Sequence, residues 1–362
     1  MLIRSADSAL YRSKIKLWLP MVVLIVGMIS MLVYHSYSAV PDPRNTAGYV
    51  VYWDQDRGFA SVERNASALG TVSPWWYSLN WSGEVVRQHN GITEIDHKTV
   101  ASLRARNIKI IPTIANHRDG WWDNEVVGSV LGDPDRVRAH VRGIVDLVVR
   151  QGYDGIDVDY ENLNSTDRDA FTGFVRELST SLRAHGKTLV VDLHAKTSDA
   201  GADERNFAQN YAAIGAAADQ VRIMTYDFHW QTSAPGPLAP IGWVDEVIAW
   251  TVTQIPREKI VIGLPLVGYD WVAGWGEPIT WEEAQARAHE YQATINYDPG
   301  IEAPWFTYVD DADQKHTVWF ENVHSVAAKL ELVHRHDIAG VFFWRLGGED
   351  PRIWPLVRPD PS

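Results

Sequence analysis

Hydrophobic and polar positions along the chain alternate between two kinds of segment. Short runs rich in β-branched residues predict strands, and longer runs with apolar residues at every third or fourth position predict helices. The predicted strands are Gly48–Trp53, Thr71–Trp76, Ile108–Ile114, Gly155–Glu161, Leu189–His194, Val221–Asp227, Ile260–Leu266 and Gly340–Trp344. The helical patterns between them include Ile95–Arg106, Asp135–Arg150, Asp167–His185, Trp243–Gln254 and Asn322–His336.

This order of elements predicts an α/β fold with a parallel sheet. Eight strands are the number that closes a (β/α)8 TIM barrel, so we expect a barrel over residues 48–358 rather than an open doubly wound sheet. One interval, residues 269–337, is much longer than a single helix. It contains a helical stretch at Trp281–Tyr291 and an alternating segment at Pro304–Glu321. We therefore expect a small α+β insertion between the seventh and eighth strands.

The N-terminal segment has the pattern of a membrane anchor. Residues 1–16 are basic, residues 17–38 contain no Lys, Arg, Asp or Glu, and residues 39–47 form a proline-containing linker. Within residues 17–38, Leu17–Tyr34 is almost wholly apolar, and a helix of these 18 residues spans roughly 27 Å, enough to cross a bilayer core. The basic flank belongs in the cytoplasm, so we expect a single-pass protein of a bacterial cell membrane with its barrel outside. A cleaved signal peptide, which would release the barrel, is the alternative.

Composition narrows the class of function. The net charge of −13 argues against nucleic-acid binding, which needs a basic face. The absence of cysteine excludes disulfides, thiolate metal sites and thiol nucleophiles, and in an exported chain it suggests a bacterial envelope. The 17 tryptophans and 14 tyrosines suit a large core and also suit stacking on sugar rings. Nothing in the sequence requires a cofactor or a metal, and we expect a monomer.

The segment Asp154–Glu161 places several carboxylates on one face of a strand. Side chains alternate with period two, so Asp157, Asp159 and Glu161 share one face and apolar residues share the other. In a barrel the apolar face packs on the helices, so the carboxylates point inward and Glu161 reaches the C-terminal rim, where barrel active sites lie. Acids this close share protons, which raises the pKa of at least one of them. Such an arrangement produces a general acid that works near neutral pH. Asp154, which precedes the strand, is predicted to be structural.

Two other interpretations of this strand are a solvated edge and a divalent-cation site. The spacing of the acids does not match an EF-hand loop, and no close pair of histidines supports a transition-metal site. A metal-dependent carbohydrate enzyme therefore remains only as an alternative that insensitivity to EDTA would exclude.

The same residues resemble a known family. Asp154–Glu161 resembles the D-G-x-D-x-D-x-E signature of family 18 glycoside hydrolases, the chitinase-like enzymes. Met224–Asp227 is similar to the family's M-x-Y-D, and Trp344 to the tryptophan that floors its sugar subsite. The strand around Trp76 and the closing segment Phe343–Pro351 look most like the bacterial spore-germination branch, whose members act on peptidoglycan. The third predicted strand departs from the family, because Pro112–Asn116 stands where chitinases carry S-x-G-G.

The resemblance implies a mechanism in which the substrate takes part. The acetamide of the −1 sugar would attack its own anomeric carbon and form an oxazolinium ion, with Glu161 as acid and then base. Asp159 would hold the acetamide, Asp157 would share a proton with Asp159, and Tyr226 would orient the acetamide oxygen. The residues expected to bind substrate are Trp344, Asp227, Tyr52, Trp76, Asn116 and Trp230.

The expected partner is a polysaccharide that contains N-acetylglucosamine, cut at β-1,4 bonds with retention of configuration. Peptidoglycan, soluble chitin oligomers and an N-acetylated exopolysaccharide are the candidates. The rival from another class is a carbohydrate-binding lectin on the same fold, since a fold does not imply activity. Lectin members of the family typically lose the terminal acid, which is present here as Glu161.

Overall fold

The computed structural model describes residues 45–88, 97–118 and 120–358. The predicted membrane anchor at residues 17–38 lies outside these residues. Within the part that is described, no helix has both the length and the apolar character needed to cross a bilayer.

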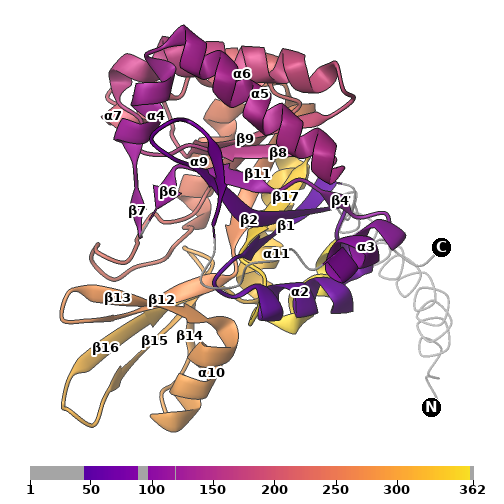
Figure 1. The fold of residues 1–362 in the computed structure, drawn as a ribbon. Helices are drawn as coiled ribbons and strands as arrows, with labels where there is room; N and C mark the ends of the chain where they lie inside the picture. Colours follow the sequence, from indigo (N-terminus) through magenta and orange to yellow (C-terminus); the bar gives the residue numbers. More distant parts are fainter. Residues whose placement is uncertain (1–44, 89–96, 119, 359–362) are drawn as a thin grey trace, which may run out of the picture. The chain divides into compact units, whose positions relative to one another are not determined.

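A closed barrel of eight parallel strands forms the centre of the fold (Figure 1). In chain order it is built from β1 (Thr46–Val51), β2 (Thr71–Leu79), β5 (Thr113–Ala115), β8 (Gly155–Asp159), β9 (Thr188–His194), β10 (Gln220–Met224), β11 (Ile260–Pro265) and β17 (Gly340–Trp344). β1 pairs in parallel with both β2 and β17, which closes the sheet on itself. The predicted barrel is therefore confirmed.

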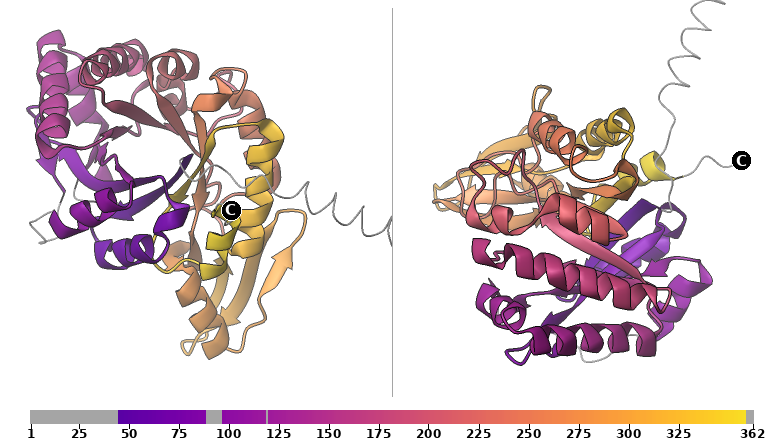
Figure 2. Two further views of the ribbon diagram at one scale, coloured as in Figure 1. Left: turned by 90° about the vertical axis from the view of Figure 1, so that its right-hand side faces the viewer. Right: turned by 90° about the horizontal axis from the view of Figure 1, so that it is seen from above.

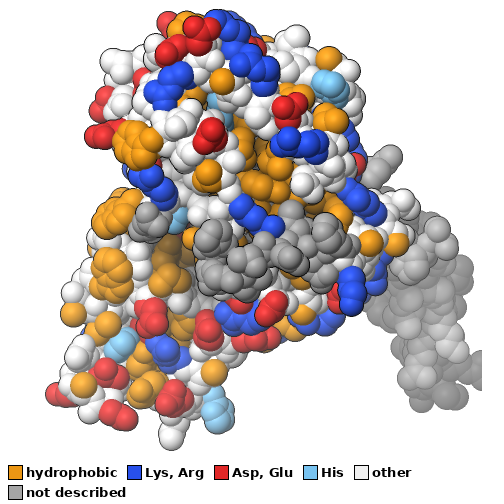
Figure 3. All heavy atoms as spheres, in the orientation of Figure 1, with side chains coloured by type: hydrophobic (Ala, Val, Ile, Leu, Met, Phe, Trp, Pro, Cys, Tyr) orange, Lys and Arg blue, Asp and Glu red, His pale blue; other side chains and the backbone are white. Residues whose placement is uncertain are grey.

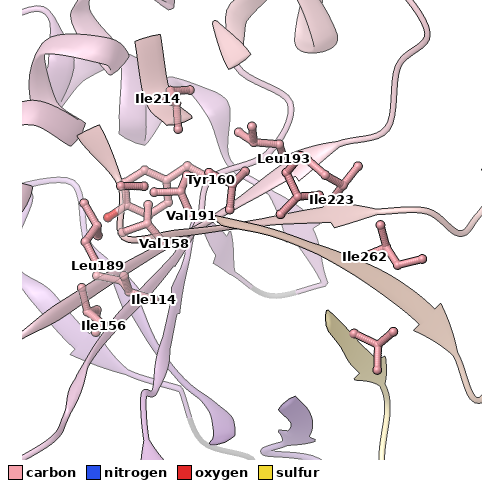
Figure 4. Packing of buried hydrophobic residues seen from close by; sticks show 14 of the residues in the cluster. Ile114, Ile156, Val158, Tyr160, Leu189, Val191, Leu193, Ile214, Ile223 and Ile262 are labelled. Atoms are coloured by element: carbon pink, nitrogen blue, oxygen red, sulfur yellow. The ribbon is translucent and has the colours of Figure 1, made fainter. Parts of the chain in front are cut away.

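Helices cover the outside of the barrel strands (Figures 1 and 2). They are α2 (Gln55–Arg64), α3 (His97–Ala105), α4 (Asn124–Leu131), α5 (Pro134–Gln151), α6 (Arg168–Arg183), α7 (Glu204–Ala208), α8 (Tyr211–Ala217), α9 (Ile241–Thr251), α11 (Val323–His336) and α12 (Trp354–Val357). Apolar side chains of the strands pack against them in a continuous outer core, part of which is drawn in Figure 4. The segment between β2 and α4 also contains four short strands, β3 (Val85–Arg87), β4 (Lys109–Ile110), β6 (His117–Arg118) and β7 (Trp121–Trp122).

The residues at the two ends of α5 explain where the helix begins and ends and how β8 follows it. Asp133 accepts hydrogen bonds from the backbone N–H groups of the first turn, and Pro134 occupies the first helical position, where a missing N–H costs nothing. Gly152 ends the helix in the left-handed conformation, with φ of 65°. The carboxylate of Asp154 then accepts from Ile110 N at 2.8 Å, so it ties the start of β8 to the neighbouring β4.

A second, five-stranded antiparallel sheet is inserted between β11 and β17. Its strand order is β13-β12-β16-β15-β14. The elements are β12 (Val267–Val272), β13 (Trp275–Thr280), α10 (Trp281–Glu290), β14 (Asn296–Asp298), β15 (Ala303–Val309) and β16 (Lys315–Trp319). One face of the sheet packs on α10 through a small apolar core of its own. Helix α11, which follows, packs against β11 and β17 and is the barrel helix that precedes the eighth strand.

Gly155 at the start of β8 provides a test of how closely the strands approach. A Cβ atom on Gly155 would lie 2.2 Å from the carbonyl oxygen of Thr188 in β9, a contact that backbone atoms cannot relieve. We predict that Gly155→Ala lowers the free energy of unfolding by about 1–3 kcal/mol. Gly173 in α6 has open space where its Cβ would be, so Gly173→Ala should instead raise it by about 0.5–1 kcal/mol. Urea unfolding of both variants measures the difference, and equal effects would contradict the packing argument.

Candidate active site

The acidic and the apolar side chains of β8 lie on opposite faces of the strand, as the alternation of side chains requires. Ile156, Val158 and Tyr160 lie in the outer core, where Figure 4 shows them beside residues of β9. Asp157 and Asp159 point into the barrel and are buried, with 0% and 5% of their surface exposed. Burying a carboxylate is costly unless other groups compensate it, so the contacts of each acid decide what it can do.

Asp157 is surrounded by hydrogen-bond donors. Its Oδ2 accepts from Tyr49 Oη at 2.6 Å, from Thr113 Oγ1 at 2.8 Å and from Arg222 Nη1 at 3.1 Å. The guanidinium of Arg222 and the carboxylate of Asp157 are both fully buried, so they form an ion pair in the interior of the barrel. Burial raises the pKa of Asp157, and the charge of Arg222 acts in the opposite direction.

Asp159 has fewer partners. Its Oδ2 accepts one hydrogen bond from Trp75 Nε1 at 3.2 Å. Burial raises the pKa of Asp159 well above its ordinary value, and the nearby charges of Glu161 and Asp157 raise it further. This acid therefore binds a proton more readily than Asp157 does.

Glu161 lies just beyond the end of β8, where the chain reaches the rim. Asn116 fixes its backbone from both sides, since Nδ2 donates to the Glu161 carbonyl at 2.9 Å and Oδ1 accepts from the Glu161 N–H at 2.8 Å. Burial, followed by the charge of Asp227, raises the pKa of Glu161 to about 8. The carboxyl group is thus protonated at neutral pH and is 16% exposed, so a molecule in the barrel mouth can reach it.

Two residues after β10 face the same space. Asp227 adopts a left-handed backbone conformation, with φ of 57°, and its Oδ1 accepts from Tyr269 Oη of the inserted sheet at 3.4 Å. Part of Asp227 is open, yet the surrounding protein displaces enough water to raise its pKa to about 6. Tyr226 stacks on Trp344 at the end of β17, with ring centroids 6.4 Å apart and an interplanar angle of 14°. Acids, a phenol and a tryptophan therefore lie close together at the C-terminal rim of the barrel.

Aromatic rings form the floor and walls of this site. Trp75 lies at their centre, parallel to Tyr52 at 5.8 Å and edge-on to Trp53, Trp122 and Trp344. Flat faces of this kind suit the apolar faces of sugar rings. On the face drawn in Figure 3, hydrophobic side chains gather beside β12 and β13, and the exposed aromatic residues of this region include Trp230 and Trp275.

Residues 45–349 match the family model described as "Glycosyl hydrolases family 18". The chain belongs to glycosyl hydrolase family 18. It is 34% identical over 319 residues to the sporulation glycosylase YdhD of Bacillus subtilis (strain 168), an alignment that covers 86% of this chain and 74% of YdhD. It is also 34% identical over 303 residues to the cortical fragment-lytic enzyme of Bacillus cereus, covering 82% of this chain and 70% of that enzyme.

Solved structures give the same result. The chitinase of Chromobacterium violaceum ATCC 12472 superposes with a TM-score of 0.80 at 30% identity, over 86% of this chain and 97% of the chitinase. The spore cortex-lytic enzyme SleL of Bacillus cereus superposes with a TM-score of 0.79 at 26% identity, over 86% of this chain and 73% of SleL. The protein is therefore a family 18 glycosyl hydrolase built on the barrel described above.

The structure brings most of the predicted site residues of this family 18 hydrolase together. Asp157, Asp159, Glu161, Tyr226, Asp227, Tyr52 and Trp344 all line the barrel mouth or its floor. Trp230 is exposed on the rim loop, where its carbonyl accepts from Trp271 Nε1.

Two predicted substrate-binding residues, Trp76 and Asn116, make contacts within the protein instead. Trp76 points to the outer side of β2, where it packs in the outer core against Phe59 and its Nε1 donates to Gln55. Its neighbour Trp75 faces the site instead. Asn116 is buried and spends both polar atoms of its amide on the backbone of Glu161, so it positions the acid.

Sequence reasoning missed three residues of the interior, namely Tyr49, Asp192 and Arg222, and interpreted His194 only as a rim or packing histidine. Asp192 and His194 lie on the inward face of β9, and Arg222 lies inward on β10. His194 Nε2 is 3.6 Å from Glu161 Oε2, and burial lowers its pKa to about 4, so it is neutral beside the acid. The available signal was a polar residue at every second position of a strand that is otherwise apolar.

Substitution of Asn116 tests whether the position of Glu161 matters for activity, because it leaves the Glu161 side chain unchanged. We predict that Asn116→Ala lowers kcat about 10- to 100-fold, because Glu161 loses both contacts that hold its backbone. KM should change much less, since Asn116 is only 1% exposed and its amide points to the backbone of Glu161. Steady-state kinetics on a chitooligosaccharide measures both values. Trp76→Phe, which alters the outer core, is the matched control and should leave kcat nearly unchanged.

Proposed function

We propose that this family 18 hydrolase cleaves β-1,4 linkages of glycans containing N-acetylglucosamine, with retention of configuration and with the acetamide of the substrate as nucleophile. The observation that carries the proposal is the pairing of one protonated acid at the rim, Glu161, with a buried acid behind it, Asp159. Glycosidases that use a carboxylate nucleophile place two carboxyl groups about 5–5.5 Å apart on either side of the scissile bond. Asp159, buried and held by Trp75, is poorly placed to attack a sugar.

The proposed reaction proceeds in two steps. In the first, the acetamide oxygen of the −1 sugar attacks the anomeric carbon while the glycosidic C–O bond breaks, and Glu161 gives its proton to the leaving oxygen. In the second, water attacks the oxazolinium ion and gives its proton to Glu161, which restores the acid. Because the nucleophile is already part of the bound sugar, the protein needs only to orient the acetamide and to transfer protons.

The other residues would hold the reacting group. Asp159 would accept the acetamide N–H and stabilise the positive charge that develops, and Asp157 would share a proton with it. Tyr226 would donate to the acetamide oxygen, and Trp344 would stack below the −1 sugar. The contact of Trp75 with Asp159 supports this arrangement, since it links the aromatic floor to the acid.

Peptidoglycan is the first candidate substrate, followed by chitin oligomers and N-acetylated exopolysaccharide. Relatives named cortical fragment-lytic enzymes support the first, and relatives named di-N-acetylchitobiase support the second. The apolar run at residues 17–38 supports anchoring of the barrel on the outer side of a bacterial membrane, where such polymers lie.

The acid role predicts a loss of activity that binding alone would not show. The purified full chain and its Glu161→Gln variant would be incubated with N-acetylchitooligosaccharides and, separately, with peptidoglycan, and products identified by mass spectrometry. We expect Glu161→Gln to lower kcat by about 10²–10⁴-fold while substrate still binds. Glycan binding without cleavage by the wild type would favour the lectin, and full activity in Glu161→Gln would contradict the proposed acid.

The raised pKa of Glu161 predicts the alkaline side of the pH profile. Glu161 must be protonated to donate to the leaving oxygen, so kcat/KM should fall as pH rises through about 8. A carboxyl group of ordinary pKa would already be ionised at neutral pH, which would place this limb about four pH units lower. Measurement of kcat/KM from about pH 3 to 10 on a soluble chitooligosaccharide distinguishes the two, with a limb near pH 4 to 5 as the contradictory result.

A further inference from the structure

Strand β9 places a further acid inside the barrel that the proposed reaction does not use. Asp192 lies on the inward face of β9, beside β8, and 3% of its surface is exposed. Its Oδ2 lies 2.6 Å from Tyr49 Oη. Tyr49 is itself buried at the bottom of the site, where it also contacts Asp157. Asp192 and Asp157 therefore meet at one phenol.

The hydrogens available at the Tyr49 hydroxyl show how many protons Asp157 and Asp192 hold between them. Its hydroxyl oxygen lies 2.6 Å from Asp157 Oδ2 and 2.6 Å from Asp192 Oδ2. Arg222 Nη1, 2.9 Å away, also donates to this oxygen. A phenol has one hydrogen and can donate it to one carboxylate only. If both aspartates were ionised, one of the 2.6 Å contacts would join two acceptors with no hydrogen between them. One of the two carboxyl groups must therefore carry a proton.

The surroundings of the two acids decide which one is protonated. Asp157 accepts from Thr113 and forms the ion pair with Arg222, and both contacts favour its charged form. Asp192 Oδ2 contacts Tyr49, and among the described residues Arg222 forms its ion pair with Asp157 and not with Asp192. A side-chain hydrogen bond with Asp192 lowers the pKa of Asp157, as expected if Asp192 is the donor. Burial raises the pKa of Asp192 well above its ordinary value and the charges of Asp157 and Asp159 raise it further, while the charge of Arg222 and the hydrogen bond with Tyr49 act in the opposite direction.

We propose that Asp192 is a positioning residue that stays protonated at neutral pH and acts as a hydrogen-bond donor in the cluster. It donates to Tyr49 Oη, and Tyr49 in turn donates to the ionised Asp157. The hydrogen bonds therefore run from Asp192 through Tyr49 to Asp157. With Asp192 protonated, the base of the site carries one negative charge instead of two.

The charged groups around Asp192 make this state matter for catalysis. Asp157 and Asp159 face it from β8, Arg222 from β10 and Tyr49 from β1, and the charge of an ionised Asp192 would also reach Glu161 and Tyr226. A second charge there would raise the pKa of Glu161 and hold its proton more tightly, so transfer to the leaving oxygen would be slower. A neutral Asp192 avoids this effect. The kinetic consequence rests on the function proposed above, whereas the protonation state does not.

Infrared difference spectroscopy tests the protonation state without any substrate. The full chain and Asp192→Asn would be compared at pH 7 in the region of the carboxylic acid C=O stretch, with Asp159→Asn as a control for the neighbouring acid. We expect Asp192→Asn to remove one protonated-carboxyl band, distinct from any band lost in Asp159→Asn. Loss of only ionised-carboxylate signal in Asp192→Asn would overturn the proposal.

The pH profile gives an independent readout. Asn resembles a protonated Asp and can still donate to Tyr49, so Asp192→Asn should change kcat/KM by less than about threefold and leave the alkaline limb in place. Asp157→Asn, which replaces the ionised member, should lower kcat/KM by about 10²-fold or more. An alkaline limb that moves to lower pH in Asp192→Asn would show that a negative charge had been removed, against the proposal.

A third variant covers the case in which Asp192→Asn does not fold, as judged by circular dichroism. In Tyr49→Phe the protonated-carboxyl band of Asp192 should shift, because its acceptor is gone, but not disappear. An unchanged carboxylic acid region in Tyr49→Phe would contradict a protonated Asp192. A wild type that cleaves none of the glycans but shows the band would refute the proposed function and leave the assignment of the proton intact.

Discussion

The buried ion pair of Arg222 and Asp157 is the interaction on which the barrel interior depends. Both side chains are fully buried, and removing one partner of such a pair costs about 3–5 kcal/mol because the other charge is left uncompensated. Arg222 already compensates the charge of Asp157. Any further carboxyl group inside the barrel would therefore ionise beside the negative charge of Asp157. The excess acids therefore hold protons, and the proton on Glu161 at the rim is the one that a substrate can reach. A cluster that looks destabilising thus leaves a protonated carboxyl group at the rim, which the proposed reaction uses as its acid.

The fold was predictable because the pattern of each strand repeats eight times. Differences from prediction arise where local chemistry interrupts a pattern. The third strand is split into β4 and β5 around Pro112, which has no N–H to donate. β10 ends before Asp227, where the backbone enters the left-handed region. The predicted insertion at residues 269–337 also includes α11, since a helical pattern alone does not say which sheet a helix covers.

The site was predictable where several signals fell on one strand and not where a single residue carried the information. Three acids at alternate positions reveal an inward face in β8, whereas Asp192 and His194 at alternate positions in β9 are a weaker pattern of the same kind. Trp75 and Trp76 are adjacent, so composition cannot say which faces inward. The register does, because Ser73, two residues before Trp75, contacts Arg222 inside the barrel. Asn116 looked like a substrate ligand because the sequence does not show which of its contacts are already satisfied.

The position of Glu161 depends on groups outside the barrel as much as on those inside it. A slip of one residue in β8 would turn its acids outward and its apolar residues into the site. Tyr160, which precedes Glu161, resists such a slip because its hydroxyl contacts Nε2 of the buried His140 at 2.6 Å. Burial lowers the pKa of His140 to about 4, so its ring is neutral and can accept from Tyr160 while Nδ1–H donates to the Gly83 carbonyl. The outer core therefore fixes Tyr160 against His140, and the alternation of side chains along the strand then turns Glu161 toward the interior of the barrel at its rim.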